Sequence, residues 1–428
     1  MVVKVLPSKV SGAIKAPSSK SCTQRALAAA LIRPGVSIIE NAGKSNDELA
    51  ARNIIQNFGA TIHEKDDTIV VNSDPDLFNP GKNEKDRIID CGESGLSMRM
   101  FAPIASLFDS DITLTGKGSI VSRPMDFLDK YLPGLGVEVR SNNGKIPIAL
   151  HGPLRPQNIR VDGGFSSQFL TGLIYAFCKA TSKKVTIEVD NLTSRPYIDL
   201  TIAVLDKFGF DVKNHNYQSF DILPYSNNSK TPVRYTVEGD WSNAAFLLVS
   251  GAVGGKVTLK GMDLNSTQGD RKIIEALDLC GASIQLKENE IIVEKSQKLK
   301  SFDFDATQCP DLFPPIVALA ANCEGISRIT GVHRLLHKES NRAIALRDEF
   351  NKMNVMIELE DNVMIVKGGR EMKGAKVSSH NDHRIAMAAT VAALNARGTM
   401  EISEAQAVNK SYPGFYNDMK KLGAKISF

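Results

Sequence analysis

The sequence lacks a long hydrophobic run, an excess of charge and any concentration of aromatic residues. No stretch approaches the roughly 18 uninterrupted apolar residues that indicate a transmembrane helix, so we expect no membrane partner. Basic residues number 52 and acidic residues 48, for a net charge of +4, and aromatic residues make up 6%. Nucleic-acid-binding proteins usually have a broad basic surface or many stacking side chains, so we expect no nucleic acid partner either.

Cysteine is also scarce, and no two cysteines form a C-x-x-C pair. Zinc sites and redox motifs usually depend on such spacing, so we interpret the thiols as reduced and structural. The N-terminus lacks the apolar core of a signal peptide, and together these features predict a cytoplasmic protein. The cysteines are Cys22, Cys91, Cys178, Cys280, Cys309 and Cys323.

The histidine and glycine patterns indicate neither a metal nor a nucleotide site. His333 and His337 are four residues apart but lack the glutamate of the H-E-x-x-H motif. His380 and His383 have no third ligand nearby in the sequence. Gly116-x-Gly118 lacks the lysine of a P-loop. We therefore expect no metal and no cofactor.

What the chain does have is a sixfold internal repeat. An apolar residue followed by Gly or Asn, which readily adopt left-handed backbone and so end helices, recurs at intervals of 77, 73, 72, 73 and 69 residues. A helical stretch precedes each pair, and two alternating runs around a polar turn follow it, which is typical of a β-hairpin. The pairs are Phe58-Gly59, Leu135-Gly136, Phe208-Gly209, Cys280-Gly281, Met353-Asn354 and Leu422-Gly423.

Each repeat opens with a helix of small apolar residues, and a β-branched run follows it. The predicted unit is therefore helix, strand, helix, strand, strand, in six copies of about 72 residues. Such units can bury helices inside a prism with sheet walls, three units to a domain, which predicts two similar α/β domains. We expect the opening helices near Ser18, Gly95, Ser166, Trp241, Asp311 and His383, and the runs at 36–39, 112–114, 185–189, 257–259, 328–330 and 400–402.

Basic residues collect at two equivalent positions of the repeat, the start of the opening helix and the loop before the second helix. The dipole disfavours cations at a helix N-terminus unless an anion lies between them. One Ser or Asp there is usually a cap, and one cation can be a solvated surface charge. Together they favour a cleft for a strongly anionic ligand. The cations are Lys20, Arg25, Arg99, Arg123, Arg195, Arg342, Arg384 and Lys410.

Two carboxylates, Asp311 and Glu339, lie among these cations. Either can act as an acid or a base if the site tunes its protonation. Both also have an ordinary structural interpretation, because Asp311 can cap the helix that begins near Phe313 and Glu339 can form an ion pair with Lys338 or Arg342. The residues alone leave both interpretations open.

Seven motifs of the sequence resemble those of the EPSP synthase (3-phosphoshikimate 1-carboxyvinyltransferase) family of enolpyruvyl transferases. The motifs occur in the family's order and extend from about residue 17 to residue 415. They are Lys20-Ser21-x-x-x-Arg25, Arg123-Pro124, Ser166–Leu170, Ser194–Asp199, Lys338-Glu339-Ser340-x-Arg342, Asn381–Arg384 and Lys410-x-x-Pro413.

This resemblance implies two inverse α/β prism domains, each of three βαβαββ repeats, with an active-site cleft between the domains. It implies that residues 1–16 plus 238–428 form domain 1, mainly on the phosphoenolpyruvate side, and that residues 17–237 form domain 2, mainly on the shikimate 3-phosphate side. By the same resemblance we expect a monomer that uses neither metal nor organic cofactor.

The family's reaction transfers the carboxyvinyl group of phosphoenolpyruvate to the 5-hydroxyl of shikimate 3-phosphate through a tetrahedral intermediate. It releases phosphate and forms 5-enolpyruvylshikimate 3-phosphate, a step of chorismate and aromatic amino acid biosynthesis. The resemblance makes Asp311 the base for the 5-hydroxyl. It makes Glu339 the acid that protonates the vinyl methylene, with Lys20 as the competing candidate.

The resemblance also assigns residues to each of the two substrates. For shikimate 3-phosphate they are Lys20, Ser21, Arg25, Ser166, Ser167, Gln168, Ser194, Tyr197, Asp311 and Lys338. For phosphoenolpyruvate they are Lys20, Gly95, Arg123, Gln168, Arg342, Arg384 and Lys410. The sequence departs from the family pattern at Arg334, Asn341 and the loop Asp90–Gly95.

Two alternatives to this function differ from it in features of the sequence. The sister enzyme that acts on UDP-N-acetylglucosamine has a similar fold, but it carries a cysteine shortly before its Arg-Pro pair, and residues 117–122 contain none. A non-catalytic anion-binding paralogue would be favoured if an acid or base were missing. Asp311, Glu339 and Lys20 are all present.

Overall fold

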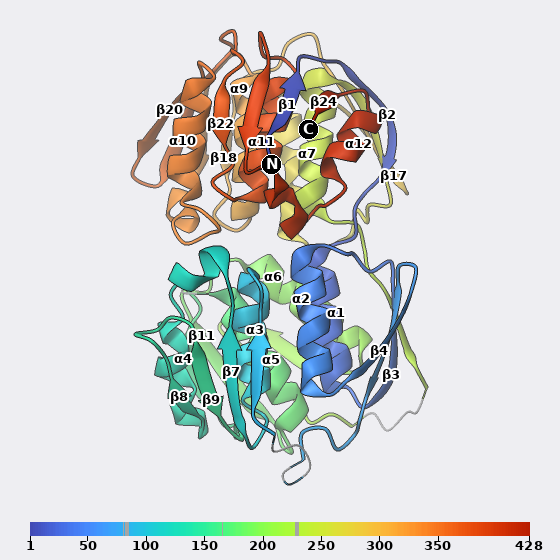
Figure 1. The fold of residues 1–428 in the computed structure, drawn as a ribbon, viewed down its shortest axis with the longest axis vertical. Helices are drawn as coiled ribbons and strands as arrows, with labels where there is room; N and C mark the ends of the chain where they lie inside the picture. The colour runs from blue at the N-terminus through green and yellow to red at the C-terminus, as the bar shows by residue number, and fades with distance from the viewer. Residues whose placement is uncertain (80, 82–84, 165, 227–230) are drawn as a thin grey trace. The chain divides into compact units, whose positions relative to one another are not determined.

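The computed structural model describes residues 1–79, 81, 85–164, 166–226 and 231–428. The chain divides into two compact units. Unit 1 consists of Met1–Pro17 and Glu238–Phe428, and unit 2 of Ser18–Val237. The elements of each unit can be followed by colour and label in Figure 1.

Unit 2 contains three repeats, each with the elements strand, helix, strand, helix, strand, strand. The first consists of β14 (Val233–Thr236), α1 (Lys20–Ile32), β3 (Gly35–Glu40), α2 (Asn46–Phe58), β4 (Thr61–Lys65) and β5 (Thr68–Ser73). The second consists of β6 (Arg87–Asp90), α3 (Gly95–Ala105), β7 (Asp111–Thr115), α4 (Asp126–Tyr131), β8 (Glu138–Arg140) and β9 (Ile148–His151). The third consists of β10 (Ile159–Asp162), α5 (Ser167–Ala180), β11 (Val185–Asp190), α6 (Arg195–Lys207), β12 (Val212–His215) and β13 (Ser219–Ile222).

Unit 1 contains three repeats with the same order of elements. The first consists of β2 (Val10–Lys15), α7 (Trp241–Gly254), β15 (Gly255–Lys260), α8 (Ile273–Leu279), β16 (Ser283–Lys287) and β17 (Glu290–Glu294). The second consists of β18 (Asp303–Asp305), α9 (Phe313–Ala321), β19 (Gly325–Thr330), α10 (Arg342–Lys352), β20 (Met356–Glu360) and β21 (Val363–Gly368). The third consists of β22 (Lys376–Ser378), α11 (His383–Ala393), β23 (Met400–Ser403), α12 (Phe415–Lys421), β24 (Lys425–Ser427) and β1 (Val3–Leu6).

Each repeat forms one four-stranded sheet with the same pairing. The order β10-β11-β13-β12 is representative, with β10 and β11 parallel and the other two pairings antiparallel. The prediction of six α/β repeats is therefore confirmed. The unit read from the residues alone was incomplete, because it lacked the strand that precedes each opening helix. Those strands lie at sheet edges, and five of the six have only three or four residues, so they show little alternation along the sequence.

The opening helices form the core of each unit. In unit 2, α1, α3 and α5 contact one another, and each packs against the sheet of its own repeat. In unit 1, α7, α9 and α11 do the same. Every residue of α3, α9 and α11 is buried. A helix with apolar residues on all its faces is expected to be buried in this way. This arrangement confirms the predicted prism of buried helices within sheet walls.

The N-terminal segment and β14 explain how the repeats close. β1 lies between β23 and β24 in the last sheet of unit 1, and β2 pairs in parallel with β15. The first sheet of unit 2 takes its edge strand from β14, which pairs in parallel with β3. Each unit therefore completes its sheets with strands from distant parts of the sequence.

Short 3₁₀ turns occupy most of the loops that precede the second helix of a repeat, where the sequence places basic residues. These turns are η1 (Gly118–Ser122), η3 (Gly269–Lys272), η5 (Val332–Leu335) and η6 (Ala405–Lys410). Two others are η2 (Pro133–Leu135) and η4 (Pro310–Leu312). All six cysteines are buried. Within the described ranges, no helix is both long and apolar enough to cross a membrane.

Candidate active site

Asp311 is the centre of a charged cluster in unit 1. It lies in η4, immediately before α9, and not at a helix cap. Its Oδ1 accepts hydrogen bonds from Arg342 Nη1 at 2.7 Å and Lys338 Nζ at 3.3 Å. Its Oδ2 accepts from Arg384 Nη2 at 3.0 Å. Three cations from two segments thus converge on one carboxylate.

Arg342, the first residue of α10, is fully buried and held by further carboxylates. Asp382 accepts from its Nε at 2.8 Å and from its Nη2 at 3.3 Å. Glu339 Oε2 accepts from Nη2 at 2.5 Å. Burial of a guanidinium is costly unless each donor finds an acceptor, and here the acceptors are carboxylates. The ion-pair interpretation of Glu339 is therefore correct in this structure, and Glu339 stays next to Asp311 through their shared partner.

The pKa values follow from this geometry. Burial acts to lower the pKa of Arg342, but the charges of Asp382, Glu339 and Asp311 outweigh it and raise the pKa well above its ordinary value. Burial lowers the pKa of Lys338, against the opposite effect of Asp311. Arg342 is therefore a permanent cation, whereas Lys338 is easier to deprotonate than a surface lysine.

The start of α11 completes the cluster. Asp382 is the N-cap of α11 and accepts from the backbone N–H of Arg384 at 3.0 Å. The ammonium of Lys410, at the end of η6, donates to the carbonyl of Asn381 at 2.6 Å. The cluster contains four cations, Lys338, Arg342, Arg384 and Lys410, and three carboxylates, Asp311, Glu339 and Asp382. Within this set the cations outnumber the carboxylates by one, and the side chains are largely buried. The cluster therefore favours an anionic ligand.

Asp270 of η3 is a titratable neighbour that the sequence did not single out. It is buried, and its carboxylate forms a short hydrogen bond with the hydroxyl of Ser242 on α7. Burial and the charge of Asp311 raise the pKa of Asp270 to about 6, against the opposite effect of Arg384. The acid is thus coupled electrostatically to two residues of the cluster.

In unit 2, Arg25 joins the starts of two helices. The side chain is buried on α1, and its Nε donates to Thr201 Oγ1 of α6 at 2.9 Å. Its terminal nitrogens donate to the carbonyl of Ser21 at 3.0 Å and to that of Tyr197 at 3.3 Å. Burial lowers the pKa of Arg25. Arg25 therefore fixes Ser21 and Tyr197 relative to each other, although it reaches them through their backbone.

Polar side chains also join the N-terminal ends of the three inner helices of unit 2. Gln24 Nε2 on α1 donates to Ser94 Oγ and Ser97 Oγ of α3, both at 2.8 Å. Arg99 Nη1 on α3 donates to Gln168 Oε1 of α5 at 3.0 Å. Because these contacts lie within the first two turns of the helices, the N-termini of the three helices gather at one end of the unit.

Three of the serines assigned to shikimate 3-phosphate lie at the starts of α5 and α6. Ser166 caps α5 and accepts from the backbone N–H of Gln168 at 3.2 Å, and Ser167 follows it as the first helical residue. Ser194 precedes α6 with left-handed backbone, at φ 57°. Lys20, at the start of α1, donates to Asp47 Oδ2 at 2.8 Å. Each position presents a hydroxyl or ammonium beside backbone donors, as an anion site requires.

Gly95 and Arg123 are in close approach. A Cβ atom at Gly95 would lie 2.5 Å from Arg123 Nη1 and 2.9 Å from its Cζ. The guanidinium is buried and lies over the start of α3. The glycine is thus required by the space that Arg123 occupies, and together they place a cation next to the N–H groups of that helix.

The structure brings five predicted residues of unit 1 into direct contact and places the rest in smaller groups. Those five are Asp311, Lys338, Glu339, Arg342 and Arg384. Sequence reasoning placed Asp382 at the start of a helix, where an Asp is an ordinary cap, and gave no role to Gln24 or Asp270; these three residues hold or surround the predicted ones. The position of Asp382 one residue before a predicted helix identifies it as a cap, but not as the partner of Arg342.

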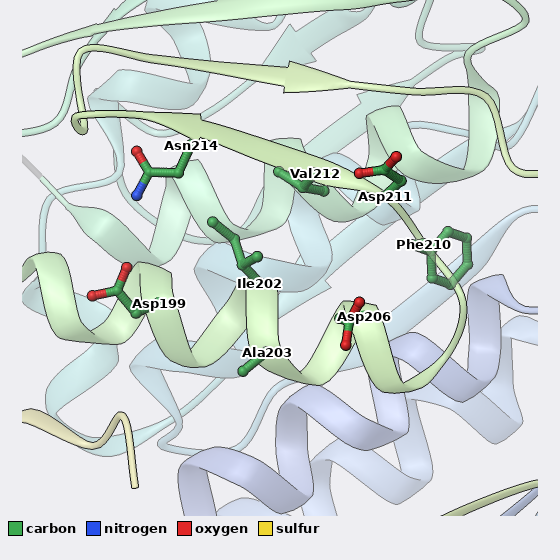
Figure 2. Close-up of a pocket in the computed structure, with 8 residues that line it drawn as sticks. All are labelled: Asp199, Ile202, Ala203, Asp206, Phe210, Asp211, Val212 and Asn214. Carbon is green, nitrogen blue, oxygen red and sulfur yellow. The ribbon is translucent and has the colours of Figure 1, made fainter. Parts of the chain in front are cut away.

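Unit 2 also has hollows outside these groups of residues. One of about 320 Å³ separates α6 from β12 and is lined by Asp199, Ile202, Ala203, Asp206, Phe210, Asp211, Val212 and Asn214 (Figure 2). None of the predicted site residues is among the described residues that line it. The described part of the chain contains no group of three or more His, Cys, Asp or Glu side chains that could hold a metal ion.

Comparison with known proteins gives consistent matches over the whole chain. A family model described as EPSP synthase (3-phosphoshikimate 1-carboxyvinyltransferase) matches residues 5–419. The 3-phosphoshikimate 1-carboxyvinyltransferase of Clostridium novyi is 37% identical, covering 99% of this chain and 98% of that protein. The one from Clostridium beijerinckii is 34% identical, covering 98% and 97%.

Solved structures give the same fold. EPSP synthase from Acinetobacter baumannii superposes with a TM-score of 0.82 at 24% identity, covering 100% of this chain and 99% of that one. The enolpyruvyl transferase NikO from Streptomyces tendae gives a TM-score of 0.76 at 18% identity, covering 100% and 98%.

Proposed function

Because the chain belongs to the EPSP synthase (3-phosphoshikimate 1-carboxyvinyltransferase) family, we propose that its charged clusters bind phosphoenolpyruvate and shikimate 3-phosphate and join them. The reaction transfers the enolpyruvyl group of phosphoenolpyruvate to the 5-hydroxyl of shikimate 3-phosphate and releases phosphate. The observation that carries this proposal is the carboxylate of Asp311, held by three cations in a cluster with excess positive charge.

In the proposed mechanism Asp311 accepts the proton of the 5-hydroxyl as the hydroxyl oxygen attacks C2 of phosphoenolpyruvate. Glu339 or Lys20 donates a proton to the C3 methylene, which gives a tetrahedral adduct. The adduct then loses a proton from C3 and its phosphate from C2, which restores the vinyl group on the product. Each step needs a positioned acid or base, and the charge that develops needs fixed cations.

Arg342, Arg384 and Lys410 are the proposed ligands of phosphoenolpyruvate in unit 1. In the structure two of them bind Asp311 directly. An arriving phosphate or carboxylate competes for these guanidinium groups, since Arg binds such anions in a bidentate manner. Binding of the anion would therefore release Asp311 from part of its cationic shell and leave its oxygens available to accept a proton.

For shikimate 3-phosphate we propose the helix starts of unit 2 as the main ligands. Ser166, Ser167 and Ser194 offer hydroxyls next to backbone N–H groups for the phosphate, with Lys338 as a cation. Ser21 and Arg25 would contact the carboxylate, and Gln168 and Tyr197 the ring. The remaining phosphoenolpyruvate ligands are Lys20, Gly95, Arg123 and Gln168.

The proposal also covers the substrate side of each domain, the oligomeric state and the cellular compartment. Residues 1–16 with 238–428 would supply mainly the phosphoenolpyruvate side and residues 17–237 the shikimate 3-phosphate side. We propose a monomeric enzyme of the cytoplasm. Its mass in solution, measured by light scattering with and without both substrates, tests the monomer.

A phosphate-release assay tests the function. The purified protein is mixed with shikimate 3-phosphate and phosphoenolpyruvate, and Asp311→Ala and Lys20→Met serve as catalytic controls. We expect phosphate and enolpyruvyl product in equal amounts, with kcat reduced at least 100-fold in both variants, since loss of an acid or base typically costs about 10²–10⁴. The proposal fails if the wild-type rate does not exceed that of the variants, or if UDP-N-acetylglucosamine replaces shikimate 3-phosphate as the acceptor.

A further inference from the structure

The turn between β12 and β13 contains a tyrosine in an unfavourable conformation. Asn216 and Tyr217 both have left-handed backbone, at φ 53° and φ 60°. Hairpin turns with two such residues strongly prefer Asn, Asp or Gly, and a bulky side chain there is uncommon. Asn214 Oδ1 accepts from the backbone N–H of Tyr217 at 2.7 Å, which holds the turn in place. We therefore expect the Tyr217 side chain to form contacts that a glycine at this position could not form.

The Tyr217 side chain contacts the first two turns of α6 at two points. Its hydroxyl donates to Asp199 Oδ2 at 2.8 Å. The guanidinium of Arg195 lies over its ring, 5.2 Å from the centroid. Arg195 and Asp199 are four residues apart, so they lie on the same face of the helix. The half-buried ring also packs against the hydrophobic core of unit 2. Tyr217 thus connects this core to the start of α6.

The segment that Tyr217 contacts is the one that carries Ser194 and Tyr197. Ser194 is itself left-handed, and its carbonyl accepts from the backbone N–H of Tyr197 at 3.1 Å. The carbonyl of Tyr197 is held in turn by Arg25 and Thr201. A strained backbone persists only where its surroundings determine it from several directions. Arg25 and Tyr217 supply these constraints from two separate segments.

We propose that Tyr217 is a positioning residue for shikimate 3-phosphate, because its hydroxyl and ring fix the start of α6 and thereby Ser194 and Tyr197. This inference rests on the proposed function, in which these two residues bind that substrate. Tyr217 does not touch the substrate in this proposal and acts only through α6. Its loss should therefore weaken binding of shikimate 3-phosphate while leaving the use of phosphoenolpyruvate nearly unchanged.

Two substitutions separate positioning from a merely structural role. Tyr217→Phe keeps the ring but removes the hydrogen bond to Asp199. We expect the Kd of shikimate 3-phosphate, measured by calorimetry without phosphoenolpyruvate, to rise about three- to tenfold, as loss of one hydrogen bond of ordinary net strength suggests. Tyr217→Gly relieves the backbone but removes both contacts, and we expect a rise of about tenfold or more. The KM for phosphoenolpyruvate should stay within twofold for both variants.

Asp199 supplies a rescue test. Asp199→Asn keeps an oxygen that can accept from Tyr217, so we expect a Kd within twofold of wild type, whereas Asp199→Ala should match Tyr217→Phe. The two side chains act through one hydrogen bond, so their effects should not add. We therefore expect the double variant, Tyr217→Phe with Asp199→Ala, to have a Kd for shikimate 3-phosphate no higher than that of the weaker-binding single variant. Tyr225→Phe is the matched control, because Tyr225 belongs to the same unit and packs on Phe210 instead.

Three results would overturn the inference. One is a Tyr217→Phe variant with wild-type Kd for shikimate 3-phosphate, and another is an equal rise in the KM of both substrates. The third is a Tyr217→Gly variant with a higher melting temperature and unchanged binding, since that is the outcome expected of a strained turn without a role. A wild-type protein that releases no phosphate would instead contradict the proposed function, so the two failures are distinguishable.

Discussion

At the scale of single residues, the site is built from buried charges that depend on one another. Arg342 has contacts with Asp311, Glu339 and Asp382, and the last of these is completely buried. Removing one partner of a buried pair leaves an uncompensated charge, which typically costs about 3–5 kcal/mol. The geometry of the cluster is therefore sensitive to each of its members, even those that touch no substrate.

Gly95 gives a prediction at this scale. In Gly95→Ala the new methyl group displaces the guanidinium of Arg123, which is the flexible end of its side chain, so the fold should survive. We expect the KM for phosphoenolpyruvate to rise about tenfold, because an oriented charge-assisted hydrogen bond contributes about 1.5 kcal/mol. The KM for shikimate 3-phosphate should change less than twofold.

Gly134→Ala is the control for this substitution, since a Cβ there would meet nothing within 4 Å. Steady-state kinetics with each substrate varied in turn measures the effect. An unchanged KM for phosphoenolpyruvate in Gly95→Ala would show that Arg123 does not bind this substrate in its present position.

At the scale of elements, the strands that complete the sheets carry much of each unit's stability. β1 is a central strand of its sheet, between β23 and β24, although it begins at the third residue of the chain. Its side chains alternate between the core and the outer face, as a strand with one buried face requires. Chain ends usually tolerate substitution, but one tied into the middle of a sheet does not.

Val5 and Leu6 test the role of β1. Val5 is 0% exposed and Leu6 is 40% exposed, so adjacent residues of one strand face opposite sides. We expect Val5→Ala to lower the free energy of unfolding of unit 1 by about 2 kcal/mol, because two buried methyl groups are lost and a cavity remains. Leu6→Ala should change it by less than about 0.5 kcal/mol. Urea denaturation measures both, and equal losses would mean that β1 does not pair as described.

At the scale of the whole molecule, pH should affect stability through Asp270. Because its pKa is raised to about 6, the folded protein binds a proton between about pH 4 and 6 that the unfolded chain has released. The contribution of this group to the free energy of unfolding is therefore highest at low pH, where Asp270 is protonated, and it falls as the pH rises to about 6. Above that pH the buried carboxylate is charged and destabilising.

Asp270→Asn removes this dependence. We expect its melting temperature to exceed that of the wild type by about 2–8 °C at pH 8, as one to two pKa units in a domain of this size suggest. The difference should shrink towards zero near pH 4. Scanning calorimetry over this range tests it, with the exposed Asp348→Asn as control. A constant difference at all pH values would contradict the assignment of the titration to Asp270.

The amount that could be predicted from the sequence differs between elements. The opening helices and the β-branched runs were found because they are long, strongly patterned and repeated six times, so each copy supports the others. The first strand of each repeat was missed because these strands lie at sheet edges and five of the six have only three or four residues. The ion pair of Asp382 with Arg342 was missed because an Asp before a helix has the same sequence pattern whether it only caps the helix or also binds a distant cation.

The sequence by itself determined the sixfold repeat, its α/β character and the residue types of the charged clusters, since these follow from local periodicity and from motifs of fixed spacing. The tertiary structure decided which strands complete each sheet and which side chains face one another. β14, at the C-terminal end of unit 2, pairs with β3 near its N-terminal end. Tyr217, in the turn between β12 and β13, contacts Asp199 on α6. Such contacts depend on how separate segments pack, and no local pattern records that packing.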